Sequence, residues 1–254
     1  MSTLSGRCVV TLKKPRKLVD NFFNFNEANG GEAQLFMLKV DNLHTNYYKD
    51  WTKAGEHQFW TKLAVSDHVC HIYQNEEDFL SLLHGFASNG FEAGDCVLII
   101  ATAEHLKALN ARIRAAGLQP SELIASGRYL PFDANKLLAR FMVDHWPDEE
   151  LFMKMVAELT SLAYKTDKPV RVFGEMVAIL WAQGHGGATV QLEYLWKSVC
   201  EREEFCLFCA YPQADFTEGS GASLTNICNC HTKLVAGCAN SPTELFYKNT
   251  VLKK

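Results

Sequence analysis

The segment VRVFGEMVAILW, residues 170–181, decides how the rest of the chain is interpreted. Its first five residues are typical of a core strand that ends at Gly174, and more apolar residues follow. Glu175 stands between the two apolar parts. Because a carboxylate is rarely buried without partners, the segment predicts a strand that ends at a polar anchor.

Five further segments have the character of strands, and helix-like segments lie between them. CVLIIA is a continuous apolar run, as a strand buried on both faces requires. Strands separated by helices indicate a mainly parallel sheet with both faces covered, which is a three-layer α/β sandwich. Ligands of such sheets bind at the carboxyl ends of the strands. The five segments are VCHIY (69–73), CVLIIA (96–101), GRYLPFD (127–133), FCLFCAY (205–211) and TKLVA (232–236).

Apolar residues at helical spacing predict the helices between these strands. Asn75 and Thr102 are suited to cap the first two, and Gly117 to end the second. We expect further helices over residues 135–146 and 148–164, and another that carries the stripe Ala188, Leu192, Leu195 and Val199. The predicted stripe of the helix at 148–164 is Leu151, Met155, Leu159 and Leu162.

The chain divides into three parts on composition. Residues 1–66 are rich in Asn and aromatic residues and form an N-terminal extension of unknown role, with one strand expected at 33–40. Residues 67–240 form the α/β domain, and residues 241–254 form a C-terminal tail.

Charge and hydrophobicity exclude several classes of partner. The net charge is −4, with 25 Lys and Arg against 29 Asp and Glu, which argues against broad binding of nucleic acid or anionic membranes. No apolar run approaches the roughly 18 residues of a membrane span. The basic residues of the N-terminus follow its apolar ones, the reverse of a secretory signal, so we expect a cytoplasmic protein.

The loop after the first core strand argues against a nucleotide site. A phosphate-binding loop needs glycines and a lysine, whereas this loop, QNEEDFLS (74–81), has neither and carries three acids. Repulsion between these carboxylates and phosphate makes binding there unfavourable. We therefore expect no cofactor.

From residue 68 to 238 the chain resembles the MEDS domain, the methanogen/methylotroph, DcmR-type sensory domain, in the form found ahead of bacterial sensor histidine kinases. The resemblance implies a degenerate relative of RecA-like ATPases that senses small organic molecules and does not catalyse a reaction. The matching segments are HVCHIYQNEEDF (68–79), FEAGDCVLIIATAEHLKALNARI (91–113), ASGRYLPFDANKLLARFMVDHWPDEELF (125–152), VRVFGEMVAILWAQGHGGATVQLEYLWKSV (170–199), FCLFCAYPQADF (205–216) and ICNCHTKLV (227–235).

Five residues are predicted to bind the small organic ligand at the carboxyl rim: His68, Tyr73, Glu175, Tyr211 and His231. His68 and His231 rank above His71 because they match motif positions of the family. Three roles remain open for Glu175: handling Mg²⁺ or water as in an ATPase, contacting a ligand, or pairing with backbone amides or a histidine.

The nine cysteines are expected mainly as buried small residues of a reducing compartment. Zinc is disfavoured for Cys206 and Cys209 because residues three apart on a strand face opposite sides. A thiol redox sensor at Cys228 or Cys230 is a further hypothesis. We expect no bound metal.

Three functions remain in competition. The first is a sensory domain that passes its signal to a histidine kinase or another signalling protein, or through a change in a homodimer. The second is a residual nucleotide-binding protein or ATPase. The third is a protein-interaction scaffold in which residues 1–66 form the docking surface.

Overall fold

The computed structural model describes residues 59–216, 221–237 and 244–247. They contain a seven-stranded sheet of order β3-β2-β6-β7-β1-β8-β9, in which only β9 runs antiparallel to its neighbour. The strands are β1 (His68–Tyr73), β2 (Cys96–Ala101), β3 (Tyr129–Asp133), β6 (Val170–Gly174), β7 (Phe205–Pro212), β8 (Lys233–Gly237) and β9 (Glu244–Tyr247).

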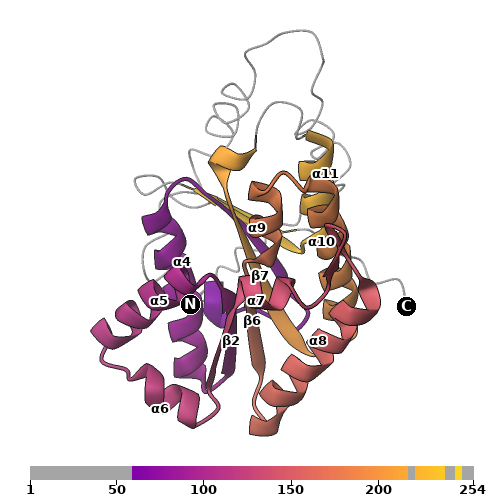
Figure 1. Cartoon of the computed structure of the whole chain (residues 1–254). Coiled ribbons are helices and arrows are strands. Elements are labelled where there is room, and N and C mark those ends of the chain that lie inside the picture. Colours follow the sequence, from indigo (N-terminus) through magenta and orange to yellow (C-terminus); the bar gives the residue numbers. More distant parts are fainter. Residues whose placement is uncertain (1–58, 217–220, 238–243, 248–254) are drawn as a thin grey trace, which may run out of the picture.

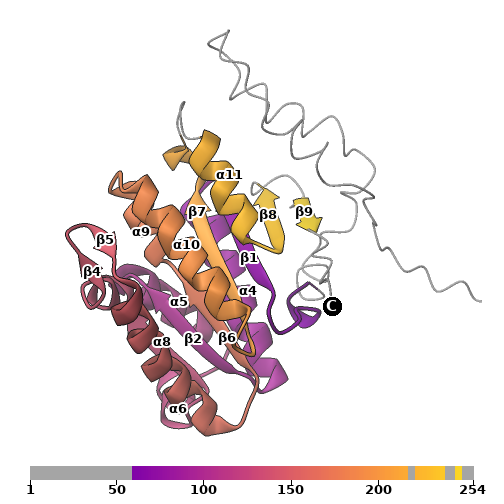
Figure 2. The same cartoon turned by 90° about the vertical axis from the view of Figure 1, so that its right-hand side faces the viewer.

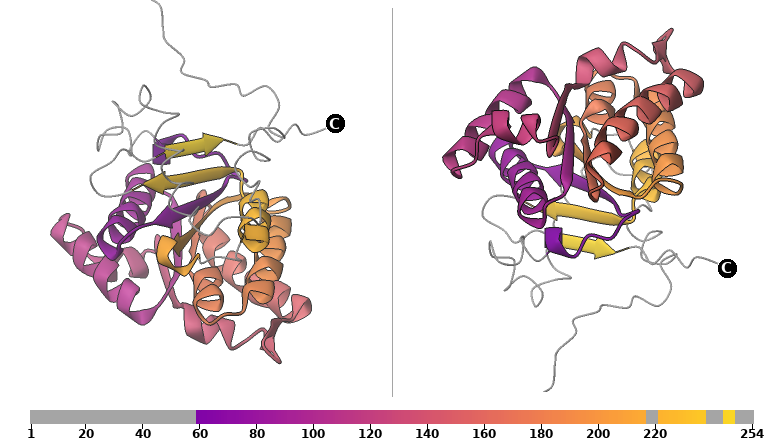
Figure 3. Two further views of the ribbon diagram at one scale, coloured as in Figure 1. Left: turned by 90° about the horizontal axis from the view of Figure 1, so that it is seen from above. Right: turned by 90° about the horizontal axis from the view of Figure 1, so that it is seen from below.

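Helices cover both faces of the sheet (Figures 1 and 2), so the predicted three-layer α/β sandwich with a mainly parallel sheet is confirmed. Seen end-on, the helices that precede β3 and those that follow it lie on opposite sides of the strands (Figure 3). One layer contains α4 (Glu76–Ala93), α5 (Ala103–Ala115) and α6 (Pro120–Ala125). The other contains α7 (Ala134–Leu138), α8 (Glu149–Ala163), α9 (Met176–Ala182), α10 (Gly186–Cys200) and α11 (Gly221–Cys230).

The chain leaves neighbouring strands toward opposite faces of the sheet at three pairs, β3/β2, β2/β6 and β7/β1, of which the last two lie inside the sheet. The chain leaves β1 and β2 through the α4–α6 layer, and it leaves β6 and β7 through the α9–α11 layer. Because β2 lies beside β6 and β1 beside β7, the carboxyl ends of these pairs are where an α/β sheet opens toward ligands.

The predicted helix starts are confirmed at two positions. The Asn75 side chain accepts a hydrogen bond from the Asp78 N–H, and the Thr102 hydroxyl accepts one from the His105 N–H. Each satisfies a donor that the first helical turn leaves without a partner. Gly117 follows α5 at a φ of +85°, which glycine adopts without strain.

The predicted helix over 135–146 is wrong beyond its first turns. Helix α7 ends at Leu138, and the chain then forms a hairpin of β4 (Met142–Val143) and β5 (Trp146–Pro147). The two turn residues, Asp144 and His145, have φ values of 49° and 63°. These values are those of a type I′ turn, which needs positive φ at both positions, and this requirement prevails over the helical spacing of the apolar residues.

The buried face of α8 is also rotated from the prediction. Met155 and Leu159 are buried as expected, but Leu151 and Leu162 are 40% and 41% exposed. Phe152 and Ala163, the next residue along in each case, take their places in the core. The stripe of α10 is buried as predicted at Ala188, Leu192, Leu195 and Val199.

A buried ion pair explains how VRVFG can be a core strand despite its arginine. The Arg171 Nε donates to Asp95 Oδ2 at 2.5 Å, and its Nη1 donates to the Trp60 carbonyl at 3.0 Å. Both charged side chains are 9% exposed. The pair therefore satisfies the polar groups that the strand buries.

The described segment before β1 packs on the core, and the one after β8 extends the sheet. Trp60 packs on Phe86 and Phe208, so residues 59–66 lie against the α4 side. β9 pairs with β8 within the segment predicted as a tail. The strand expected at 33–40 lies outside the described residues. Among the described helices, none combines the length and the apolar character that crossing a membrane requires.

The close approach of α4 to the sheet predicts that Gly90→Ala destabilises the protein. A Cβ at residue 90 would lie 2.6 Å from Val97 Cγ2 and 3.0 Å from Arg171 Cδ. Overpacking costs about 1–3 kcal/mol, which exceeds the gain in helix propensity of about 1 kcal/mol. Urea denaturation should therefore show a lower midpoint. In the matched variant Gly174→Ala, the nearest atom is Leu207 Cδ1 at 3.9 Å, so its midpoint should fall less. A larger loss in Gly174→Ala would contradict this packing.

Candidate functional site

The five residues predicted to bind a ligand do not share one rim. Tyr73 and Glu175 lie at the carboxyl ends of β1 and β6. His68 is instead the first residue of β1, and His231 lies two residues before the start of β8. Tyr211 is near the end of β7, but its hydroxyl contacts Glu193 of α10. The predicted grouping at the carboxyl rim is therefore wrong for His68 and His231, since both lie at the amino ends of their strands.

At the rim, Glu175 links β6 to the start of α5. Its Oε2 accepts a hydrogen bond from the Thr102 N–H at 2.8 Å, and its Oε1 lies 2.7 Å from His105 Nδ1. Glu175 is 7% exposed. The carboxylate has both kinds of partner, a backbone amide and a histidine, that the structural interpretation of this residue required. Contact with a ligand stays a prediction.

His105 lies between two carboxylates at this rim. Its Nδ1 faces Glu175 at 2.7 Å and its Nε2 faces Glu76 Oε1 at 2.6 Å. Both nitrogens can donate only when the ring is protonated. Burial acts to lower the pKa of His105, but its contacts with Glu175 and Glu76 outweigh burial and raise that pKa.

Tyr73 is the half-buried aromatic residue of the rim. Its ring stacks on Phe79 with centroids 4.9 Å apart. Burial raises the pKa of its hydroxyl, and the negative charges of Glu175, Glu76 and Asp215 raise it further. Tyr73 therefore remains a neutral hydrogen-bonding group beside the carboxylates.

The turn between β1 and α4 does not fit a nucleotide phosphate. The Asp78 N–H, which could bind an anion at a helix start, already donates to Asn75 Oδ1 at 3.0 Å. Glu76, Glu77 and Asp78 fill the first turn of α4 and would repel phosphate. The local chemistry agrees with the sequence argument against a phosphate-binding loop.

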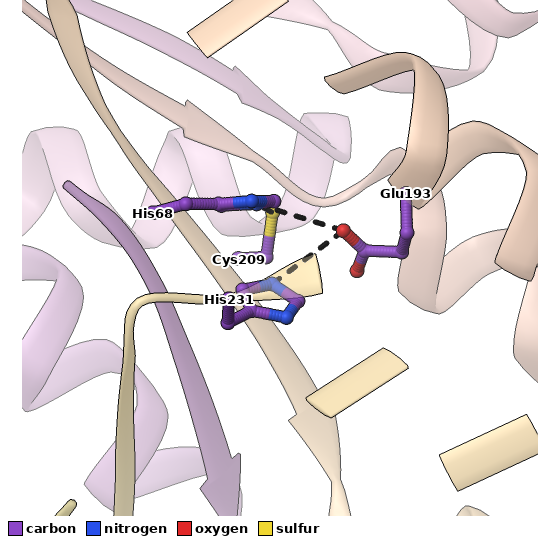
Figure 4. Close-up of side chains that lie close together, drawn as sticks. All are labelled: His68, Glu193, Cys209 and His231. Carbon is purple, nitrogen blue, oxygen red and sulfur yellow. Dashed lines mark hydrogen bonds and ion pairs between the residues drawn. The ribbon is translucent and has the colours of Figure 1, made fainter. Parts of the chain in front are cut away.

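A second polar group lies inside the core on the α10 side of the sheet (Figure 4). His68 comes from β1, Cys209 from β7, Glu193 from α10 and His231 from the turn after α11. Their potential ligand atoms all lie within 4.8 Å of one another. Each residue is at most 2% exposed, so water does not solvate the group from outside.

Hydrogen bonds fix the orientation of these side chains. The Nδ1 atoms of His68 and His231 face the carbonyls of Cys230 at 3.1 Å and Ile227 at 2.7 Å. Their Nε2 atoms each lie 3.5 Å from Glu193 Oε2. The other carboxylate oxygen, Oε1, accepts a hydrogen bond from the Tyr211 hydroxyl.

Burial dominates the electrostatics of this group. Burial raises the pKa of Glu193 to about 8, although the Tyr211 hydroxyl acts in the opposite direction. Burial, together with the neighbouring His231, lowers the pKa of His68 well below its ordinary value. Burial and the nearby Glu193 raise the pKa of the Cys209 thiol. Without a compensating cation, the interior therefore favours neutral groups.

Glu193 is the member that the sequence argument missed. It lies at helical spacing from Thr189 and Trp196, two buried residues of α10. A carboxylate on the buried side of an amphipathic helix was the signal that could have indicated it. Cys206 and Cys209 do face opposite sides of β7 as predicted, and only Cys209 reaches this group.

The two candidate redox cysteines lie at the end of α11. Cys230 is 2% exposed and Cys228 is half-buried. Reaction with an oxidant needs access to the sulfur, which the fold offers more at Cys228 than at Cys230. A redox role for either residue stays a prediction.

A separate pocket of about 460 Å³ lies beside α7, the β4–β5 hairpin and the end of α9. Leu138, Met142 and Leu180 give it an apolar part, and His145 and His185 lie on its polar part. The two imidazole rings stack with centroids 5.1 Å apart. The volume falls within the range of small-molecule sites, which is about 300–1,000 Å³.

Known structures define the class of the fold. A Pyrococcus horikoshii OT3 protein studied as Project ID PH0250 is 13% identical, with a TM-score of 0.50 over 77% of this chain and 92% of that one. The KaiC-like protein PH0186 from the same organism is 8% identical, with a TM-score of 0.50 over 72% and 79%. The chain is thus an α/β protein of RecA-like fold.

The family follows from the sequence. The model of the MEDS family, described as the MEthanogen/methylotroph, DcmR Sensory domain, matches residues 67–232. This is more than half of the chain, and the chain belongs to that family. None of the curated proteins matches the chain. The resemblance seen in the motifs is confirmed, and the RecA-like fold that it implied is confirmed as well.

The His105 geometry predicts a pH-dependent contribution to stability. Because its pKa is raised in the folded state, the contribution is complete below the unfolded pKa of about 6.5 and is lost as pH rises through the folded pKa. The difference in unfolding free energy between wild type and His105→Gln should therefore shrink from pH 6 to pH 9. Chemical denaturation across this range measures it.

His84 provides a control of opposite sign. Burial and the nearby Arg112 lower the pKa of His84. Its contribution to the free energy of unfolding should therefore increase as pH rises through the ordinary histidine pKa. His84→Gln should accordingly show the reverse trend. Equal trends in the two variants would contradict the assignment of His105 as a protonated partner of Glu175.

Proposed function

We propose that the protein is a sensory module that binds a small organic molecule and passes the signal to a partner protein without catalysing a reaction. The observation that carries the proposal is the state of the carboxyl rim in a member of a sensory family. Where an ATPase of this fold would hold phosphate, the rim has an acidic, capped helix start and a carboxylate already paired with His105.

The pocket beside α7 and α9 is the proposed ligand site. Its apolar side, formed by Leu138, Met142 and Leu180, suits a hydrocarbon portion, and its histidines can bind one polar substituent. We therefore favour a small organic ligand that has a hydrocarbon portion and a polar substituent. Tyr73 and Glu175 at the rim remain the alternative position predicted from the sequence.

Helix α10 supports a route for the signal. It begins at Gly186, directly after His185 of the pocket, and it carries Glu193 in the core. A ligand that favours one position of His185 would also favour one position of this helix. The free energy of that shift is limited to the difference in the ligand's affinity for the two positions. A histidine kinase or a second copy of the chain would receive the change.

A ligand screen tests the proposal. Wild-type protein is heated with short alcohols, halogenated methanes and small carboxylic acids, and the expected result is a higher melting temperature with at least one class. Met142→Trp, which fills the pocket, and His185→Ala should remove that increase. His84→Ala changes a histidine of the opposite helix layer and should retain it.

Two outcomes would overturn the proposal in favour of its competitors. Stabilisation by ATP with Mg²⁺, reduced by Glu175→Gln, would support residual nucleotide binding. Absence of stabilisation by every class, with a partner captured only when residues 1–66 are present, would support an interaction scaffold.

A further inference from the structure

Two buried histidines, His68 and His231, both direct the Nε2 atom toward Glu193. A carbonyl oxygen only accepts hydrogen bonds, so the Nδ1 atoms of His68 and His231, which face carbonyls, carry the ring protons in the neutral state. Each Nε2 then presents a lone pair, and both lie 3.5 Å from the same oxygen of Glu193. Three electron-rich atoms therefore converge on one point inside an apolar core (Figure 4).

One proton does not resolve this arrangement. A protonated Glu193 could donate to one Nε2, and the other would then depend on the weak S–H donor of Cys209, whose Sγ lies 3.4 Å from His68 Nε2. Both separations of 3.5 Å also exceed the usual length of an O–H···N or N–H···O hydrogen bond of about 2.7–3.2 Å. Cys209 Sγ adds a fourth potential ligand, 3.4 Å from His68 Nε2.

We propose that His68 Nε2, His231 Nε2, Cys209 Sγ and Glu193 Oε2 bind one divalent transition-metal ion, with zinc as the best fit. The proposal concerns a site separate from the ligand pocket and does not rest on the proposed sensory function. It also revises the expectation of no bound metal. That expectation rested on the opposite orientations of Cys206 and Cys209, whereas the proposed ion uses Cys209 without Cys206.

The spacing of the four atoms fits a tetrahedral ion. Bonds of about 2.0–2.3 Å to nitrogen, oxygen and sulfur place neighbouring ligand atoms of a tetrahedron about 3.3–3.8 Å apart. The three separations involving His68, His231, Glu193 and Cys209 are 3.4, 3.5 and 3.5 Å. All the remaining separations lie within 4.8 Å, so small side-chain shifts suffice.

Charge balance favours a dication in this interior. A thiolate and a carboxylate together carry two negative charges, and two neutral imidazoles carry none. A divalent ion makes the buried site neutral, whereas any unbalanced charge would incur a large desolvation cost. The mixture of sulfur, nitrogen and oxygen ligands suits zinc and similar ions rather than Mg²⁺ or Ca²⁺.

Outer contacts of the kind found around metal ligands are already in place. Each imidazole donates its Nδ1–H to a backbone carbonyl, which fixes the ring with Nε2 toward the ion. The Tyr211 hydroxyl donates to Glu193 Oε1 and so leaves Oε2 directed inward. An ion bound there would link β1, β7, α10 and the turn before β8.

Cobalt substitution of the full-length protein provides the test. The chain is unfolded in guanidinium chloride that contains a chelator and a reducing agent, and it is freed of chelator and refolded with Zn²⁺ or Co²⁺. The desalted protein is then analysed by elemental mass spectrometry and absorption spectroscopy. One ion per chain is expected. The cobalt form should show a thiolate-to-metal charge-transfer band and the strong visible bands of a tetrahedral ion.

Variants then assign the ligands. Cys209→Ser should lose the charge-transfer band, and Cys206→Ser, on the opposite face of the same strand, should keep it. Tyr211→Phe leaves all four ligands present and should weaken metal affinity by about 10–100-fold. Far-ultraviolet circular dichroism identifies any variant that fails to fold, and the wild-type cobalt spectrum requires no variant.

Two results would overturn the proposal. One is wild-type protein that refolds with native circular dichroism yet retains neither metal. The other is a cobalt spectrum that Cys206→Ser abolishes and Cys209→Ser leaves intact, which would place the ion elsewhere.

Discussion

The pairing of β1 with both β7 and β8 is the constraint on which the buried polar group depends. In the parallel register, Cys70 lies opposite Cys209 on one side and opposite Leu234 on the other. The start of β1 therefore lies next to β7 and to the turn that enters β8. Residues that are 141 and 162 positions apart in the sequence come into hydrogen-bonding distance through this pairing. The α10 layer then supplies the carboxylate that faces them.

Glu175 and Glu193 illustrate two ways in which this fold retains a buried carboxylate. Glu175 lies where β6 ends, so a backbone amide and a histidine of the adjacent connection reach it directly. Glu193 lies on the buried face of α10, where its described contacts are the Tyr211 hydroxyl and two imidazoles. The first arrangement is complete as an ion pair between protein groups. Around Glu193, by contrast, the Nε2 lone pairs of two histidines face one carboxylate oxygen. This arrangement is the one that suits the proposed metal ion.

The sequence predicted the features that local patterns control. The apolar runs located the six parallel strands, and the capping residues Asn75 and Thr102 located two helix starts. The β4–β5 hairpin was missed because two positive φ angles, at Asp144 and His145, are not visible in hydrophobic spacing. The grouping of His68 with Glu193 was missed because it depends on which strands are neighbours. Family motifs indicated His68 and His231 without indicating where their strands begin.

The position of β1 inside the sheet, between β7 and β8, has a consequence for the synthesis of the protein. Among the described strands β1 is the first to leave the ribosome, yet its described neighbours begin only at Phe205, about 130 residues later. At translation rates of about 5–20 residues per second, it waits roughly 7 to 26 s before its partner strands β7 and β8 are made. During that interval the apolar segment is a target for chaperones and for aggregation, and a chain truncated before β7 would never complete its central ladder.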